Sequence, residues 1–326
     1  MMLKPTTTLF LALACCAASF GANRFTPAAY RSAIVMDAAS GEVLFSDHAD
    51  LMSPPASMTK LMTFAVLDDR IKSGALSLQT PVTVTAADAR VAMMRDSTSV
   101  WLKAGEVFPI EELIYAMMIQ SANDAAVAVA RTVAGSVPAF VELMNAKARE
   151  LGMTHSVFKT PNGLPPPDRR ISDGDLTTPR DFALLSRYLV LHTDILKYTS
   201  VKNRNFAFGK RFPPTQMTNH NHLLGKIAGV DGLKTGFTNG AGFCLAATAH
   251  RGDRRVIVVM MDSPDSKSRD LKVSQLIEFG FTAHPIGGPL SPAPAPAPAS
   301  ASAPSPAPVA AGGGPRIEFA LPAGTR

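Results

Sequence analysis

Strand-like segments stand near both ends of one long stretch of this 326-residue chain, with helical segments between them. "SAIVMD" and "EVLFSD", joined by a turn at Gly41, predict an antiparallel hairpin over residues 32–47. Apolar runs at residues 229–237, 242–251 and 254–263 predict an antiparallel meander near the other end. This order favours an α+β fold with one antiparallel sheet built from both ends of the domain and flanked by helices.

The segment between the two groups of strands has apolar residues at three- and four-residue spacing, which is typical of helices. Pro109, Pro138 and Pro179 stand at expected helix starts, where their missing N–H costs nothing. These helices would form an inserted, mostly helical lobe, and a last helix would close the domain. The expected helices span residues 59–71, 109–120, 124–134, 138–151, 179–191 and 266–279.

The two ends of the chain differ in composition from its middle. Residues 1–22 combine a lysine, a short apolar run and small residues, which predicts a secretory signal peptide and export to the periplasm or cell envelope. Residues 286–326 are rich in proline and alanine and predict a disordered spacer. The folded domain should span residues 25–285. Once the leader is removed, only Cys244 of the three cysteines remains, so no internal disulfide is expected.

The net charge of +6 and the pI near 9.3 favour contact with anionic envelope polymers or membrane surfaces. Nucleic acid is not an expected partner, because the basic residues are scattered and aromatic residues make up only 7% of the chain. We expect neither a cofactor nor a metal. His220 and His222 alternate in "TNHNHLL", but no third ligand stands at a diagnostic spacing.

The stretch "SMTK" places a serine and a lysine three residues apart. If a helix begins near Ala56, Ser57 and Lys60 share one helix face and can touch. A serine hydroxyl is a weak nucleophile until a base removes its proton. Lys60 can be that base only when neutral, a state that burial and a second cation would both favour by lowering its pKa. The alternative is a polar first turn with a solvated lysine, and this motif arises by chance roughly once in such a chain.

Two further motifs follow in order. "SAN" places Ser121 and Asn123 in a short break between two expected helices, where helix capping is the structural alternative. "KTG" at residues 234–236 lies on an expected strand and occurs by chance in only about one chain in fifteen to twenty. Lys234 would be the second cation near Lys60. Three such motifs in this order are hard to ascribe to chance.

The set SxxK, SxN and KTG resembles that of penicillin-binding proteins and class A β-lactamases. With "TPNGLP" and "GFTNGAGFCLAATA", it makes residues 33–281 similar to the D-alanyl-D-alanine carboxypeptidase family, the low-molecular-mass penicillin-binding proteins of peptidase family S11. The resemblance implies a penicillin-binding protein/β-lactamase-like fold. It also implies a serine carboxypeptidase that trims D-alanine from peptidoglycan stem peptides through an acyl-enzyme on Ser57, with β-lactam antibiotics as covalent inhibitors.

The resemblance also assigns roles to the other motif residues. Ser121 would relay a proton to the departing amine, and Asn123 would hold the substrate amide and the lysine. Thr235 would bind the terminal carboxylate beside Lys234. Arg269 would assist it, although a solvated arginine near a helix start is the alternative.

The resemblance also gives roles to backbone groups near the first and third motifs. The N–H groups of Ser57 and Phe237 would hold the oxyanion of the tetrahedral intermediate. Gly236 would let the substrate approach the strand edge closely and lie along it as an added strand. Some relatives have histidine where this chain has Phe237, so the pH dependence and the leaving-group preference cannot be carried over.

Other functions remain to be weighed against this one. A DD-endopeptidase that cleaves peptidoglycan cross-links would use the same residues. A class A β-lactamase needs a deacylating glutamate, but Glu142 and Glu150 do not stand in a Glu-x-x-Leu-Asn setting. A catalytically silent envelope-binding protein would not need the intact motifs. Membrane association is left open, because the Pro/Ala spacer stands where many relatives have a β-rich domain and an amphipathic helix.

Overall fold

The structure is a computed structural model that describes residues 30–207 and 209–283. The expected signal peptide at residues 1–22 and the expected tail at residues 286–326 lie outside the described residues. By its contacts the chain divides into residues 1–291 and 292–326, and every feature below belongs to the first unit. Cys244 is buried and unbridged within it.

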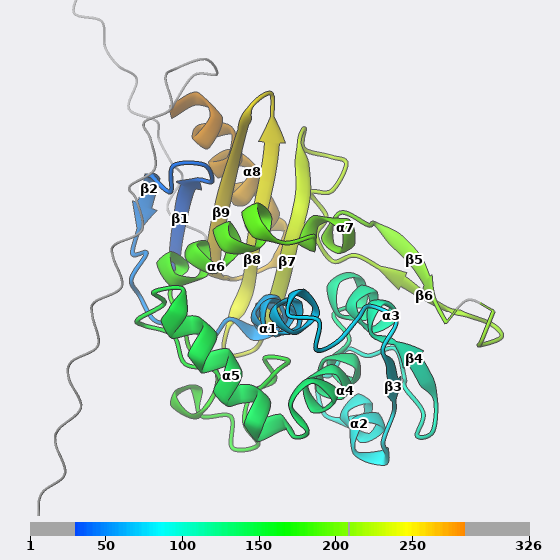
Figure 1. Cartoon of the computed structure of the whole chain (residues 1–326). Helices are drawn as coiled ribbons and strands as arrows, with labels where there is room; N and C mark the ends of the chain where they lie inside the picture. Colours follow the sequence, from blue (N-terminus) through cyan, green and yellow to red (C-terminus); the bar gives the residue numbers. More distant parts are fainter. Residues whose placement is uncertain (1–29, 208, 284–326) are drawn as a thin grey trace, which may run out of the picture. The chain divides into compact units, whose positions relative to one another are not determined.

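The described residues contain a five-stranded antiparallel sheet in the order β2-β1-β9-β8-β7 (Figure 1). The hairpin from the start of the domain pairs with the meander from its end, with Val35 opposite Val258. The expected sheet built from both ends is therefore confirmed. Its strands are β1 (Ser32–Asp37), β2 (Val43–Asp47), β7 (Val230–Thr238), β8 (Gly242–Arg251) and β9 (Arg254–Ser263).

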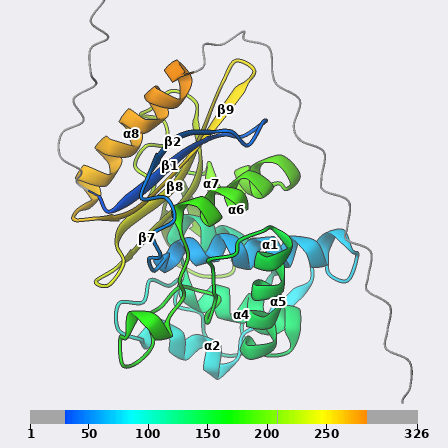
Figure 2. The ribbon, with the colours of Figure 1, turned by 90° about the vertical axis from the view of Figure 1, so that its left-hand side faces the viewer.

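Both faces of the sheet are covered (Figure 2). The last helix, α8 (Ser266–Ala283), packs on one face, and α6 (Pro179–His192) packs on β1 and β9 from the other. In β9, Val256 and Val258 belong to the apolar cluster under α8, while Ile257 belongs to the large core shared with the helices. A strand buried on both faces has no solvent side, which explains its uninterrupted apolar run.

The inserted segment is mostly helical, as expected. The helix expected at residues 59–71 begins one turn early as a 3-10 turn, and the one expected at 109–120 divides into an α-helix and a π-helix. Its helices are η1 (Ala56–Thr59), α1 (Lys60–Lys72), α2 (Ala86–Arg90), η2 (Val91–Met93), α3 (Ile110–Tyr115), η3 (Ala116–Gln120), α4 (Asn123–Ala134), α5 (Val137–Glu150), η4 (Ile171–Asp173) and α7 (Ile195–Thr199). Two small antiparallel pairs join β3 (Pro81–Thr83) to β4 (Val107–Pro109) and β5 (Asn203–Phe206) to β6 (Thr215–Thr218).

None of the described helices alone has the length and apolar composition needed to cross a bilayer. Only α4 and α5 taken together reach both, and that pair is bent by 86°.

The contact between α8 and the sheet depends on a residue without a side chain. A Cβ on Gly280 would lie 3.0 Å from Val35 Cγ1 and 3.1 Å from Val256 Cγ1. Gly280→Leu should therefore lower the free energy of unfolding by about 1–3 kcal/mol through overpacking, although leucine is the better helix former. Urea denaturation measures the change.

Gln275→Leu is the matched control, because it adds the same side chain to α8 at an exposed position. It should alter the free energy of unfolding by no more than about 0.5 kcal/mol. Equal stability of the two variants would contradict the close packing of α8 on the sheet.

Candidate active site

Ser57 and Lys60 meet at the start of α1. Ser57 lies in the 3-10 turn η1, and Lys60 is the first residue of the helix that follows. The three-residue spacing brings Lys60 Nζ to 2.9 Å from Ser57 Oγ. Ala56, just before the serine, has a left-handed backbone with φ +48°. The contact expected from the spacing is confirmed, and Lys60 is fully buried rather than solvated.

The Lys60 amine has two other hydrogen-bond partners. It lies 2.7 Å from Asn123 Oδ1 and 2.8 Å from the carbonyl oxygen of Asn162. Both oxygens can only accept, so a neutral amine donates its two hydrogens to them and directs its lone pair at the hydroxyl of Ser57. Burial, reinforced by the charge of Lys234, holds the pKa of Lys60 well below its ordinary value. The geometry and the lowered pKa both favour the neutral form of this amine.

Lys234 and Arg269 supply positive charge behind the site. Lys234 is 2% exposed on β7 and donates to the backbone carbonyl of Thr235 at 3.0 Å. Burial and the nearby charge of Arg269 lower its pKa to about 7. Arg269 lies in the first turn of α8, is 3% exposed and donates to Asp270 Oδ1 at 2.7 Å. The alternative of a solvated arginine is therefore wrong.

Ser121 occupies the break between η3 and α4 in a left-handed conformation, with φ +64°. Its hydroxyl is buried and has no hydrogen-bond partner in the described part of the chain. Asn123 begins α4 and donates through Nδ2 to Ser97 Oγ at 3.2 Å. Ala122 is the N-cap, and no side chain caps this helix. Helix capping therefore does not account for the presence of Ser121 and Asn123 at this position.

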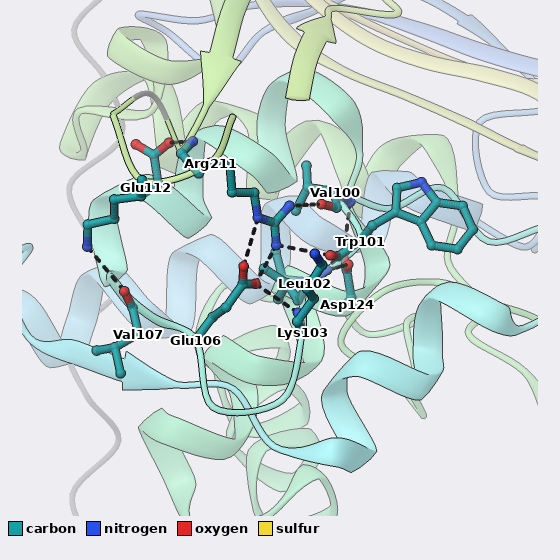
Figure 3. A network of polar contacts seen from close by, with 12 residues as sticks. Val100, Trp101, Leu102, Lys103, Glu106, Val107, Glu112, Asp124 and Arg211 are labelled. Atoms are coloured by element: carbon teal, nitrogen blue, oxygen red, sulfur yellow. Dashed lines mark hydrogen bonds and ion pairs between the residues drawn. The ribbon is translucent and has the colours of Figure 1, made fainter. Parts of the chain in front are cut away.

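The loop beside this break is fixed by polar contacts (Figure 3). Thr98 accepts from the backbone N–H of the motif asparagine at 2.8 Å and donates its hydroxyl to the carbonyl of the motif serine at 3.1 Å. Asp124 accepts from the N–H of Leu102 at 3.0 Å. Arg211, from the segment between β5 and β6, donates to the carbonyls at 100 and 101 and pairs with Glu106. These contacts hold the serine and the asparagine against the core.

The three motifs line one cleft of about 330 Å³ between the edge strand β7 and the helical lobe. Lys60 and Lys234 lie behind its surface, where both are buried. Phe237 is half exposed in the cleft wall and stacks on Phe243, with ring centroids 4.2 Å apart. The other predicted site residues in the wall are Ser57, Ser121, Asn123, Thr235, Gly236 and Arg269.

Two glycines allow backbone to press on the turn that carries Ser57. A Cβ on Gly236 would lie 2.5 Å from the carbonyl oxygen of Pro55. A Cβ on Gly163, where φ is +80°, would lie 1.9 Å from the carbonyl oxygen of Ala56. Close packing against Pro55 therefore requires glycine at position 236. The sequence had suggested a different reason, namely the close approach of the substrate to the strand edge. No role for Gly163 or Asn162 follows from the sequence alone, although "TPNGLP" contains both.

Asp175 is a buried acid to which none of the three sequence motifs points. Its carboxylate accepts from Thr59 Oγ1 at 2.8 Å, from Thr160 Oγ1 at 3.0 Å and from the backbone N–H of Lys159 at 2.7 Å. Burial raises its pKa. These bonds tie η1, which carries Ser57, to the loop that supplies the Asn162 carbonyl, so Asp175 positions two of the three hydrogen-bond partners of the Lys60 amine.

His220 and His222 do not belong to a cluster of metal ligands. The described residues contain no group of three or more His, Cys, Asp or Glu side chains placed to hold a metal. His222 Nδ1 lies 3.0 Å from Asp270 Oδ2. His220 lines the cleft, and burial together with the charge of Lys234 lowers its pKa to about 4, which leaves it neutral near pH 7.

This chain is similar in sequence to a family of known enzymes. A family model described as D-alanyl-D-alanine carboxypeptidase matches residues 22–265. The D-alanyl-D-alanine carboxypeptidase DacC of Escherichia coli is 38% identical over 266 residues, which cover 80% of this chain and 64% of that protein. A D-alanyl-D-alanine endopeptidase of Pseudomonas aeruginosa is 31% identical over 71% of each chain.

A solved structure agrees in fold. The ampicillin-bound Penicillin-Binding Protein D2 of Listeria monocytogenes matches with a TM-score of 0.67 and 31% identity, over 78% of this chain and 97% of that one. The chain spans less than two thirds of the length of the Escherichia coli relative. Because the family model covers well over half of the chain, this protein belongs to the D-alanyl-D-alanine carboxypeptidase family, peptidase family S11.

Proposed function

We propose that this protein is a serine D-Ala-D-Ala carboxypeptidase that removes the terminal D-alanine from peptidoglycan stem peptides. The observation that carries the proposal is the buried Lys60 amine, 2.9 Å from Ser57 Oγ, with its other two bonds directed at oxygens that only accept. Family membership supports the same reaction. β-Lactam antibiotics would acylate the same serine, as the ampicillin-bound relative suggests.

Acylation begins with proton transfer. Lys60 takes the proton of Ser57 as the serine oxygen attacks the carbonyl carbon of the penultimate D-alanine. The backbone N–H groups of Ser57 and Phe237 stabilise the oxyanion that forms. When the intermediate collapses, the C–N bond breaks and the departing amine receives a proton through Ser121. Water then releases the shortened peptide from the acyl-enzyme.

The terminal carboxylate of the substrate is bound on the cationic side of the cleft. Thr235 and Arg269 line that side, with Lys234 buried behind them. Asn123 bonds to Lys60 through its oxygen and is placed to hold the substrate amide as well. No cofactor is needed in this scheme, because a neutral amine and backbone N–H groups supply the acid–base and electrostatic functions.

The alternatives are less well supported. Among the described residues no glutamate lines the cleft, and Glu150 on α5 pairs with Lys147 instead. This arrangement favours slow hydrolysis of penicillin over β-lactamase activity. The Pseudomonas aeruginosa relative named an endopeptidase keeps cross-link cleavage as the second candidate. The intact motifs disfavour a silent envelope-binding protein.

The proposed function also has consequences for where the protein acts in the cell and for the two ends of the chain. The substrate lies in the cell envelope, so the proposed activity requires export to the periplasm or envelope, consistent with the expected signal peptide at residues 1–22. Residues 286–326 would act as a spacer outside the catalytic domain. Membrane association is not part of the proposal.

The proposed reaction is tested by incubating the purified protein separately with pentapeptide-bearing and cross-linked muropeptides, followed by chromatography. Free D-alanine should appear from the pentapeptide, and Ser57→Ala should reduce its release by roughly 10³-fold or more. Cleavage of cross-links alone would show that the protein acts as an endopeptidase instead. Cleavage of neither substrate would favour the silent binding protein.

The role of Lys60 is tested with Lys60→Arg. Arginine keeps the positive charge but cannot accept a proton near neutral pH. Acylation by a fluorescent penicillin should fall by about 10²- to 10⁴-fold while circular dichroism stays that of the folded protein. Lys103→Arg, at an exposed lysine, should leave acylation at its normal rate. Near-normal acylation of the Lys60→Arg variant would rule out Lys60 as the general base.

The pH dependence tests the coupling between the two buried lysines. Acylation should rise with pH as Lys60 loses its proton. The charge of Lys234 lowers the pKa of Lys60, and in the acid range Lys234, with a pKa of about 7, is itself charged. Lys234→Gln removes that charge, so the acid limb of the acylation rate should move to higher pH. Lys226→Gln, at an exposed lysine, should leave it in place. An acid limb that stays in place or moves to lower pH in Lys234→Gln would contradict the coupling between Lys60 and Lys234.

A further inference from the structure

Two phenylalanine rings form an aromatic surface in the wall of the catalytic cleft. Phe237 on β7 stands directly opposite Phe243 on β8. Side chains of directly opposed residues emerge on the same face of an antiparallel sheet, and these two rings stack with their centroids 4.2 Å apart. Both line the cleft, and we call them the aromatic pair. The proposed reaction uses the backbone N–H of Phe237 but gives the two rings no task.

The aromatic pair is more exposed than a purely structural contact requires. A cross-strand pair of aromatic residues stabilises a hairpin, and this is the structural alternative. Lys234 and Thr235, earlier on the same strand, are only 2% and 5% exposed. Phe237 is 50% exposed, so much of an apolar side chain faces water in the cleft wall. Covering that surface with an apolar group of a ligand is favourable.

The aromatic pair lies beside the residues that bind the terminal carboxylate of the substrate in the proposed mode. Successive side chains of a strand alternate between its two faces, so Phe237 and Thr235 share one face of β7. Thr235 stands opposite Leu245, which belongs to the apolar cluster under α8. The shared face is therefore the one on which α8 packs, and Arg269 in the first turn of α8 lines the same cleft.

This placement makes the side chain of the terminal residue the group that can cover the rings. In the proposed mode that residue holds its carboxylate on Thr235 and Arg269, and its side chain starts from the carbon that carries the carboxylate. Residues two apart in a strand are separated by about 6.6 Å along its axis. The methyl group of D-alanine extends by one bond only and leaves the ring of Phe237 largely uncovered. A longer apolar side chain reaches that ring.

The charges on this side of the cleft disfavour a charged side chain. Arg269 and Lys234 are buried here, and Asp270 is already shared between Arg269 and His222, so a cationic side chain would be repelled. An anionic side chain would meet the negative face of an aromatic ring. His220 also lines the cleft, and burial lowers its pKa to about 4, which leaves it neutral near pH 7. The surroundings therefore favour an uncharged apolar side chain.

We propose that the aromatic pair binds the side chain of the terminal, departing residue, and that the protein releases D-residues with large apolar side chains in preference to D-alanine. The inference rests on the proposed function, since the same attack by Ser57 must release the residue. The reaction is unchanged in its balance. The bond between the carbonyl carbon and the amide nitrogen breaks, water supplies a hydroxyl to that carbon, and the departing amine gains a proton.

The preference is tested with synthetic diacetyl-L-Lys-D-Ala-D-Xaa peptides, in which D-Xaa is alanine, norleucine, phenylalanine or lysine. Chromatography measures the free D-residue. All four peptides yield the same acyl-enzyme, so differences in kcat/KM arise before the terminal residue departs. Each buried methylene should raise kcat/KM by up to roughly fourfold. The norleucine and phenylalanine peptides should therefore exceed the alanine peptide by about fivefold or more, and the lysine peptide should fall below the norleucine peptide.

Variants of one ring connect the preference to the aromatic pair. Phe237→Ala removes the exposed ring, so the ratio of phenylalanine to alanine kcat/KM should fall toward one. Phe237→Leu keeps apolar surface and should reduce the ratio less. Phe212→Ala is the matched control, because it removes a fully exposed phenylalanine between β5 and β6, and it should keep the ratio. Each ratio compares two substrates on one protein, so partial unfolding of a variant cancels.

The outcomes distinguish the subsite from the reaction. D-Alanine released faster than the apolar residues, or as the only residue released from the tripeptides or the pentapeptide muropeptide, would overturn the subsite while the carboxypeptidase reaction stands. A ratio that is unchanged in Phe237→Ala would overturn the role of the aromatic pair. A lysine peptide faster than the norleucine peptide would contradict the preference for an uncharged side chain. No release from any peptide, the muropeptide included, would refute the reaction and the subsite with it.

Discussion

The site depends on keeping one lysine amine fully buried, unpaired with any carboxylate and in contact with a serine hydroxyl. Removing an amine from water favours its neutral form, and the second buried lysine adds to that effect. The nearest partners of Lys60 are accordingly a hydroxyl, an amide oxygen and a backbone carbonyl rather than an acid. A carboxylate in place of any of them would favour the charged lysine and would remove the neutral amine that the proposed mechanism needs.

This requirement explains why distant parts of the chain meet at one point. The serine comes from η1 and the lysine from the first position of α1, the amide from α4 and the carbonyl from the loop after α5. The second cation comes from β7, and Arg269 from α8 lowers its pKa in turn. Since β7 and α8 come late in the chain and β1 comes early, the site lies where the two ends of the domain meet in one sheet. The fold is thus the means by which two lysines are buried near each other.

The sequence was enough to predict the elements that follow from hydrophobic periodicity and the contacts that follow from motif spacing. The sheet built from both ends, the main helices and the contact of Ser57 with Lys60 all followed from patterns. The β3–β4 and β5–β6 pairs did not, because strands of three or four residues show no clear alternation and pair at a distance in sequence. Asn162 acts through its carbonyl, a group that every residue has. Asp175 is one acid among 26, and only the fold shows that three neighbours donate to it.

The open edge of β7 has a consequence for how the protein behaves at high concentration. An edge strand presents unpaired backbone groups that can add a strand from any other chain, which is a route to self-association. Here η1 lies against one part of β7 and α7 against another, with Gly232 close to Thr199. These two contacts restrict the part of the β7 edge with which another chain could pair. The turn that positions Ser57 thus also limits strand addition at this edge of the sheet.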